Sequence, residues 1–425
     1  MSVVLPQSIN YTESLPSLPD NTQQIPVVAS PVNGASFTSG AQIQFDLLNR
    51  GFLVPDSMYL RYTTSVTNTG AFQVFQTGCP AYNPFTRLDV QIGSQTVDTI
   101  QSYNVLMNML TNLSLDVGQK YGLQPGFGYL NNSSVPTLEQ LDARDLGAVA
   151  TTQSYSLGAP LMSILSNSEK LIPLFAMPQI RIVLTMDAIA NCFSIATGGA
   201  VTAFTLSNLE LVYKVVDMGG QVEDMVRSMG DKIYIKSQSF SCASQTLASG
   251  ANGYNELVFN QRYASVKSLF AINGGTAAAS VNKAFDSYDI TTNNGDYSFS
   301  VGGVIYPQRP ISTLVNRAGA LMELKSATGS IYDKSNAFSI NSVEYAYVSA
   351  NTTTAQAMAK FYVGTSTEKL SSDSLLTGIS TQNSPISYRI SLGTATSQAH
   401  LITLVANYDA LIEVDTVNRQ VAVKC

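Results

Sequence analysis

Charged side chains are scarce in this sequence. Lysine, arginine, aspartate and glutamate make up 12% of the 425 residues, about half the share found in an average globular protein. The 23 basic and 29 acidic residues give a net charge of −6, and no run rich in lysine or arginine is present. Because nucleic-acid binding draws on such runs, we expect no direct contact with a genome. With 45% hydrophobic residues, the chain is expected to fold.

Histidine and clustered cysteine, which build many catalytic and metal sites, are also nearly missing. His400 is the only histidine, so no catalytic or metal site that needs a pair of histidines can form. We expect it to lie at the end of a strand. Cys79, Cys192, Cys242 and Cys425 are far apart, with no CxxC pair. This spacing indicates buried or incidental thiols in a reducing compartment and no disulfide scaffold.

Two groups of carboxylates could in principle supply a glycosidase pair or a divalent-metal site. They are Glu223 with Asp224, and Glu139 with Asp142 and Asp145. Both groups fit better as solvated charges in loops or at helix ends. Motifs of nucleotide-binding loops, hydrolase elbows and zinc proteases are absent. The glycine-rich segment 122–128 is predicted to be a loop because Pro125 interrupts it. We therefore predict no catalytic residue, no cofactor and no metal site.

No part of the sequence has the pattern of a signal peptide or a membrane-spanning helix. The N-terminus lacks a basic region followed by an apolar stretch, and no window approaches about 20 uninterrupted apolar residues. We expect synthesis in a cytosol without membrane insertion. The chain has five glycosylation sequons, which a sequence rich in Asn, Ser and Thr produces by chance. They begin at Asn10, Asn112, Asn131, Asn132 and Asn351.

The first half of the chain combines an extended start with mostly strand-like patterns. Residues 1–40 carry five prolines among polar residues, which predicts an extended N-terminal arm. Apolar residues recur at helical spacing over 99–113, which predicts an amphipathic helix. The segment 114–160 is poor in apolar residues and is predicted to be a long loop system. Alternating patterns predict strands at 43–47, 58–62, 88–92, 171–175, 179–186 and 204–216.

The second half repeats this order of elements. Gly219, Gly220 and Gly230 bracket a polar, helix-like stretch that is typical of a linker. A helix is predicted from about residue 314 to 324. Strands are predicted at 232–240, 257–259, 264–272, 297–305 and 339–345, followed by a helix at 352–362 and strands at 387–392, 400–409 and 411–423.

Two all-β units of this size fit the eight-stranded jelly roll. We therefore predict an all-β fold of two eight-stranded jelly rolls in tandem, with short helices inserted in loops. The predicted parts are an N-terminal arm (1–40), a first jelly roll (41–218), a linker (219–230) and a second jelly roll (231–425).

Three segments carry a resemblance to a known family. Residues 83–110 combine a strand, a short polar turn and a helix with Tyr103-Asn104 near its start; 171–184 contain a Leu-Ile-Pro segment before a strand; and 264–272 form a strand of the second unit. They resemble the double-jelly-roll major capsid proteins of tailless icosahedral viruses, such as polinton-like viruses, virophages and membrane-containing phages.

The resemblance implies a structural protein of the virion capsid. It implies homotrimers whose six jelly rolls have a pseudo-hexagonal outline and tile an icosahedral shell, assembled inside the host cell. The implied partners are other copies of the chain, together with penton and minor capsid proteins. Contact with any underlying membrane would be made by those other proteins.

A second class of protein stays open on composition. A carbohydrate-binding or adhesive β-sandwich protein, such as a phage fibre or a surface protein, would share the hydroxyl-rich, weakly charged sequence. The absence of tryptophan weakens that alternative without excluding it, because tyrosine also stacks on sugars. An enzyme on paired jelly rolls would need a metal or carboxylate site, and a single histidine excludes the His-rich cupin type.

Overall fold

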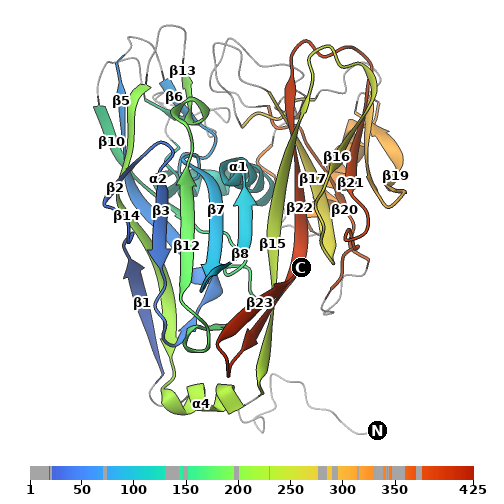
Figure 1. Ribbon diagram of the computed structural model, residues 1–425. Coiled ribbons are helices and arrows are strands. Elements are labelled where there is room, and N and C mark those ends of the chain that lie inside the picture. The colour runs from blue at the N-terminus through green and yellow to red at the C-terminus, as the bar shows by residue number, and fades with distance from the viewer. Residues whose placement is uncertain are drawn as a thin grey trace, which may run out of the picture.

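The computed structural model describes most of the chain. The described residues are 19, 22–69, 74–129, 143–146, 152–195, 201–228, 230–275, 285–289, 295–313, 315–329, 331, 338–340, 342, 344–346, 359–369 and 376–425. Figure 1 shows two β-sandwiches side by side, the first coloured blue to green and the second yellow to red. Within the described residues, strand pairing stays inside each half.

The first sandwich contains every strand up to residue 217. The strands are β1 (Gln23–Ala29), β2 (Ser36–Thr38), β3 (Gln42–Asp46), β4 (Phe52–Leu53), β5 (Tyr59–Asn68), β6 (Val74–Thr77), β7 (Phe85–Ile92), β8 (Gln95–Gln101), β9 (Ala143–Asp145), β10 (Thr152–Pro160), β11 (Ile172–Pro173), β12 (Ile180–Met186), β13 (Phe193–Ile195) and β14 (Val201–Asp217). One sheet is built on β10-β5-β14, a second has the order β3-β12-β7-β8, and a small third sheet has the order β13-β6-β9. Alternation explains the burial: Leu60, Tyr62 and Val66 of β5 face the core.

The second sandwich is organised around two long strands. Its strands are β15 (Lys232–Leu247), β16 (Gly253–Phe259), β17 (Val266–Gly275), β18 (Asp296–Val301), β19 (Val304–Ser312), β20 (Tyr362–Ser366), β21 (Ile386–Leu392), β22 (His400–Asp415) and β23 (Gln420–Lys424). One sheet has the order β15-β22-β17-β20, with β23 on β22, and the other has the order β16-β21-β18-β19. β15 and β22 pair along their whole lengths, from Lys232↔Asp415 to Leu247↔His400.

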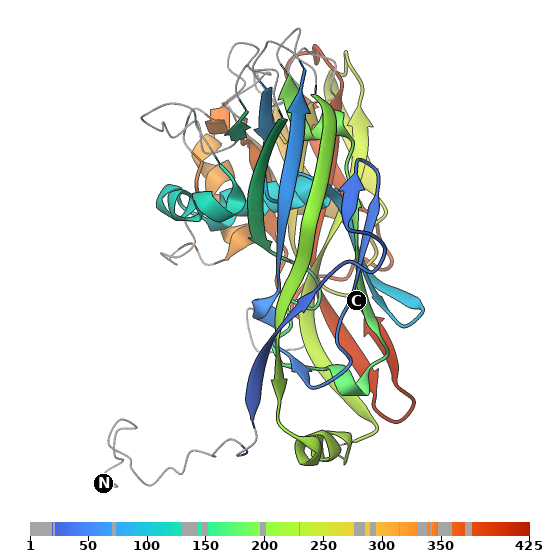
Figure 2. The same ribbon diagram turned by 90° about the vertical axis from the view of Figure 1, so that its left-hand side faces the viewer.

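Short helices connect or cover the sheets. They are α1 (Tyr103–Ser114), α2 (Val117–Phe127), α3 (Ile189–Cys192), α4 (Gly220–Ser228) and α5 (Arg317–Thr328). α4 joins β14 to β15 at one end of the molecule, here called the base (Figure 1), and it has no buried residue. β1 and the hairpin of β22 and β23 also extend toward the base (Figure 2). The helices α2 and α5 both project from one side of the molecule in the same view. Buried apolar residues of both halves form one continuous cluster.

The expected N-terminal arm is partly built into the first sandwich. Residues 23–29 are extended, as predicted, but they pair with Leu211–Asp217 of β14, and Phe37 of β2 is buried. The edge position of β1 tolerates Pro26, since one side of an edge strand needs no ladder partner. The part of the arm from residue 1 to 18 lies outside the described residues.

The sequence-based assignment of 99–160 is wrong in three places. Residues 99–101 belong to β8, and α1 begins only at Tyr103. The segment 122–128 is not a loop: α2 runs through Pro125 and ends at Gly128, whose φ of 82° is the left-handed stop that glycine favours. The start of α2 is fixed by Asp116, which accepts a hydrogen bond from the Gln119 N–H. The predicted loop system also contains β10, which forms because it pairs with β5.

Several second-half predictions also need correction. The strand expected at 297–305 is a hairpin of β18 and β19 that turns at Gly302 and Gly303. The strands expected at 400–409 and 411–423 are one long strand, β22, followed by β23. Residues 344–346 form a 3-10 turn instead of a strand, and the helix expected at 352–362 lies mostly outside the described residues. His400 begins β22, as predicted.

The burial of Phe37 gives a direct test of whether residues 23–38 belong to the sandwich. We expect Phe37→Ala to lower the free energy of unfolding by about 3–5 kcal/mol, because it removes a core ring. The control Val28→Ala changes a side chain that is 48% exposed and should cost no more than about 0.5 kcal/mol. Denaturant unfolding followed by fluorescence measures both. Equal, small effects would mean that this segment is a free arm.

Candidate functional site: the interface between the two jelly rolls

Among the described residues, the side chains considered for catalysis do not assemble into a site. Glu223 and Asp224 lie on the exposed helix α4, where Asp224 forms an ion pair with Arg227. Of the second group, Asp145 falls on β9, and Glu139 and Asp142 lie outside the described residues. In the described part of the chain, no group of three or more metal-ligating side chains comes together.

The histidine and the cysteines are packed into the protein. His400 is buried, and burial lowers the pKa of its imidazole. Cys79, Cys192 and Cys242 are buried free thiols. Burial raises the pKa of Cys79 to about 11 and that of Cys242 to about 12, so these thiols are poor nucleophiles. None of the helices in the described residues is long and apolar enough to cross a lipid bilayer.

The polar groups that do converge lie between the two jelly rolls, around Asp98. This residue lies on β8, the edge strand of the first sandwich that packs against β15 of the second. Ser239 of β15 donates its hydroxyl to both carboxylate oxygens, at 2.9 Å each. The Ile164 N–H donates at 3.1 Å, and the Tyr408 hydroxyl of β22 lies at 3.4 Å. One carboxylate therefore binds donors from both halves of the chain.

The surroundings of Asp98 are almost dry, and no cationic side chain among the described residues forms an ion pair with it. The residue is only 3% exposed, and the ring of Tyr408 stacks on Tyr263 with centroids 3.9 Å apart. Burial raises the pKa of Asp98 to about 6, although the hydrogen bonds from Ser239, Ile164 and Tyr408 work in the opposite direction. The desolvation cost of the charge thus outweighs the stabilisation by its donors.

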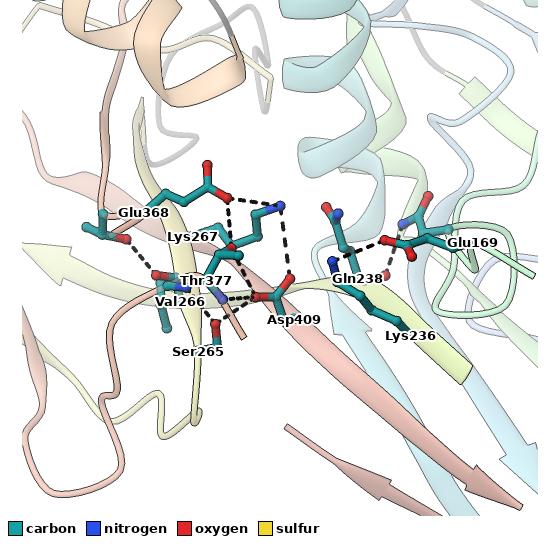
Figure 3. Close-up of polar contacts among 12 residues, drawn as sticks. Glu169, Lys236, Gln238, Ser265, Val266, Lys267, Glu368, Thr377 and Asp409 are labelled. Atoms are coloured by element: carbon teal, nitrogen blue, oxygen red, sulfur yellow. Dashed lines mark hydrogen bonds and ion pairs between the residues drawn. The ribbon is translucent and has the colours of Figure 1, made fainter. Parts of the chain in front are cut away.

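A loop of the first jelly roll, residues 164–169, lies along β15 and extends this interface. The Ser237 hydroxyl donates to the Ile164 carbonyl, and Asn167 donates to the backbone oxygen of Gln238 at 3.1 Å. Lys236 forms an ion pair with Glu169 at 3.2 Å. Figure 3 shows this pair beside Gln238. Apart from that one ion pair, these contacts use hydroxyls, amides and backbone groups.

Helix α1 makes a separate contact with the second jelly roll through Asn112. Its amide donates to the Tyr362 hydroxyl at 3.1 Å, and its backbone oxygen accepts from the Ser339 N–H at 3.0 Å. The buried ammonium of Lys120 donates to the amide oxygen. Asn112 is 1% exposed, so the sequon that begins there is not accessible in the folded protein. The other four sequons lie outside the described residues.

At the base, a groove of about 620 Å³ separates the two halves. The first jelly roll lines it with the turn 92–95 and Pro178, and the second with Lys232 of β15 and with the hairpin of β22 and β23. Lys232 and Lys424 both contact Glu413 here and lower the pKa of its carboxyl. The tight interface around Asp98 therefore opens toward the base.

Sequence reasoning missed Asp98 because the end of its strand, residues 99–101, was assigned to a helix. A signal was nevertheless available. Asp98 and Ile100 occupy the same face of β8, and both are buried. A carboxylate at an apolar position of an alternating pattern points to a buried, hydrogen-bonded group. Ser237 and Ser239 likewise share the buried face of Ile235 in β15.

The pKa of Asp98 predicts how stability depends on pH. The folded pKa of about 6 lies above the ordinary value of 3.8, so protonation favours the folded state. The cost of the buried charge is fully present above pH 6, about 3 kcal/mol from the shift, and disappears as the pH falls toward 4. Relative to Asp98→Asn, which cannot titrate, the wild-type protein should therefore gain stability between pH 7.5 and 5.

Thermal unfolding of both proteins across this pH range measures the difference. The exposed control Asp224→Asn should differ from the wild type by a constant amount. The difference in stability between the wild type and Asp98→Asn could also prove constant with pH. In that case the carboxyl of Asp98 does not titrate in this range, and its assigned environment is wrong.

Comparison with known proteins shows which proteins share the fold of this chain. No protein-family model matches the sequence, and no curated protein sequence matches it. The faustovirus major capsid protein is similar in structure, with a TM-score of 0.65 and 9% identity over 97% of this chain and 93% of that chain. The mavirus major capsid protein has a TM-score of 0.54 and 12% identity over 100% and 95% of the two chains.

A chain of the Sputnik virophage has a TM-score of 0.56 and 11% identity, over 100% of this chain and 93% of that chain. At such low identity the similarity concerns the fold. It extends over both sandwiches and confirms the predicted all-β fold of two jelly rolls in tandem. The chain thus has the fold of these viral major capsid proteins.

Proposed function

We propose that this chain is a viral major capsid protein that acts as a structural building block and not as an enzyme. The observation that supports this proposal is the extent of the structural similarity. The faustovirus and mavirus major capsid proteins match 97% and 100% of the chain, including both jelly rolls and their arrangement. A single shared jelly roll would say much less, because that fold serves many functions.

The finer proposal concerns assembly. Three copies form a homotrimer whose six jelly rolls give a pseudo-hexagonal outline, and these trimers tile an icosahedral shell in the virion. Most soluble oligomers consist of identical chains arranged with closed symmetry. The partners are neighbouring capsomers together with penton and minor capsid proteins, and the net charge of −6 argues against direct genome contact.

The domain boundaries in this proposal follow the strand pairing. The first jelly roll extends from residue 23 to 218 instead of starting at 41, because β1 and β2 lie on β14. Residues 219–230 are the linker that contains α4, and residues 231–425 form the second jelly roll. Each unit has sheets of its own, and the contacts around Asp98 hold the two units in one orientation.

The oligomeric state tests the assembly proposal. We expect the purified full-length protein to be a trimer by multi-angle light scattering at micromolar concentration, and negative-stain images to show particles with a hexagonal outline. Both results follow from three tandem pairs of jelly rolls around one axis. A stable monomer or dimer at this concentration would contradict the proposal.

A further inference from the structure

The turn between β15 and β16 carries a chemically reactive pair of residues, Asn252 followed by Gly253. In such a pair the backbone nitrogen of the glycine can attack the side-chain amide carbon of the asparagine, because glycine has no Cβ to block the approach. The sequence contains four Asn-Gly pairs, which begin at Asn33, Asn252, Asn273 and Asn294. The asparagine of the last pair lies outside the described residues. The structure holds the other three pairs in different ways.

The geometry at Asn252 places the two reacting groups together. The Gly253 N–H donates to Asn252 Oδ1 at 2.8 Å, and a carbonyl carbon is only about 1.2 Å from its oxygen. The attacking nitrogen thus lies beside the carbon to which it would bond. Gly253 has a φ of 62°, and a Cβ built on it would meet no atom within 4 Å. The space around the nitrogen is therefore open.

The amide nitrogen of Asn252 is also free to leave. Asn252 and Gly253 are both exposed, and the Asn252 Nδ2 atom makes no hydrogen bond to the described residues. The turn itself is held by its backbone. The Gly250 N–H donates to the Thr396 carbonyl at 2.8 Å, and the Thr396 N–H donates to the Ala251 carbonyl at 3.0 Å. A fixed turn therefore presents the pair to water.

Asn33 is exposed as well, but its side chain is held away from reaction. Its Nδ2 atom donates to the Gln42 carbonyl at 2.7 Å, and its Oδ1 atom accepts from the Gln44 N–H at 3.1 Å. Both partners belong to β3. Attack by the Gly34 nitrogen requires the loss of hydrogen bonds on both ends of the amide, so we expect this pair to react more slowly than Asn252.

Asn273 is the most strongly protected of the three. It is 0% exposed and lies on β17, where Asn273 pairs with Ile402 and Gly274 pairs with Leu401. Its Nδ2 atom donates to the Tyr288 carbonyl at 3.2 Å. Reaction at this pair requires local opening of a buried strand and entry of water, and such opening is costly for core strands.

We propose that Asn252 is a site of spontaneous deamidation, and that the fold protects Asn33 and Asn273 from the same reaction. The Gly253 nitrogen loses its proton and bonds to Cγ of Asn252. The Cγ–Nδ2 bond breaks, and Nδ2 leaves with that proton as ammonia. The five-membered succinimide ring then takes up one water molecule and opens to aspartate or isoaspartate. Water is the only co-reactant, and each event adds one negative charge.

The new charge lies at the end of the molecule opposite the base. β15 begins next to α4 and extends away from the base (Figure 1), so the turn that follows its last residue, Leu247, lies at the far end. Deamidation therefore changes the charge of that end and leaves the base and the contacts around Asp98 as they are. The inference concerns the folded chain and does not depend on the proposed function.

The test is peptide mapping by mass spectrometry of the full-length protein during incubation at neutral pH. Each Asn-Gly pair is followed separately by the loss of ammonia and the gain of water. In the folded protein, conversion at Asn252 should be at least about tenfold faster than at Asn273, because Asn273 reacts only after local opening. Conversion at Asn33 should be intermediate. In guanidinium chloride, where the fold is lost, the three pairs should react at similar rates.

Gly253→Ala is the matched variant, because it keeps the amide of Asn252 and adds a Cβ beside the attacking nitrogen. It should slow conversion at Asn252 severalfold and leave the rate at Asn33 unchanged. The proposal is overturned if the folded wild-type protein converts Asn252 no faster than Asn273. It is also overturned if the three relative rates are the same with and without guanidinium chloride, or if folded Gly253→Ala converts Asn252 at the wild-type rate.

Discussion

The carboxylate of Asp98 can be satisfied only when the two jelly rolls are docked. The Ile164 N–H comes from its own half, while the hydroxyls of Ser239 and Tyr408 come from the other. A charged group removed from water without its donors costs several kcal/mol. Any rotation of one jelly roll against the other would separate Asp98 from those hydroxyls. The interaction therefore selects one relative orientation of the two sandwiches. Within the second sandwich, the pairing of β15 with β22 places Ser239 opposite Tyr408 and so holds the two donors together.

This interface uses the chemistry that dominates the composition. Its contacts are made mainly by hydroxyls, amides and backbone groups, as at Asn112 and at the loop 164–169 that lies along β15. Such groups form directional hydrogen bonds, and removing them from water costs less free energy than removing the charges of an ion pair. A chain with only 12% charged residues can therefore form large, specific contacts without many salt bridges.

The sequence predicted the fold class but not the interface. β12 and β14 were correctly predicted because their alternating residues face one core. β10 was missed because its polar sequence becomes a strand only through pairing with β5, which lies about 90 residues earlier. The role of Asp98 depends on Ser239 and Tyr408, which are distant in sequence. No local pattern reports such a contact, although the alternation of Asp98 with Ile100 shows that a carboxylate is buried.

The central claim is that contacts around Asp98 join the two jelly rolls into one cooperative unit. Differential scanning calorimetry of the full-length protein tests it most directly, because separate domains unfold in separate transitions. The account predicts one transition in the wild type, and a single transition, shifted as a whole, in Asp98→Asn. Two well-separated transitions in the wild type, each with about half of the total enthalpy, would show that the jelly rolls unfold independently and would contradict the account.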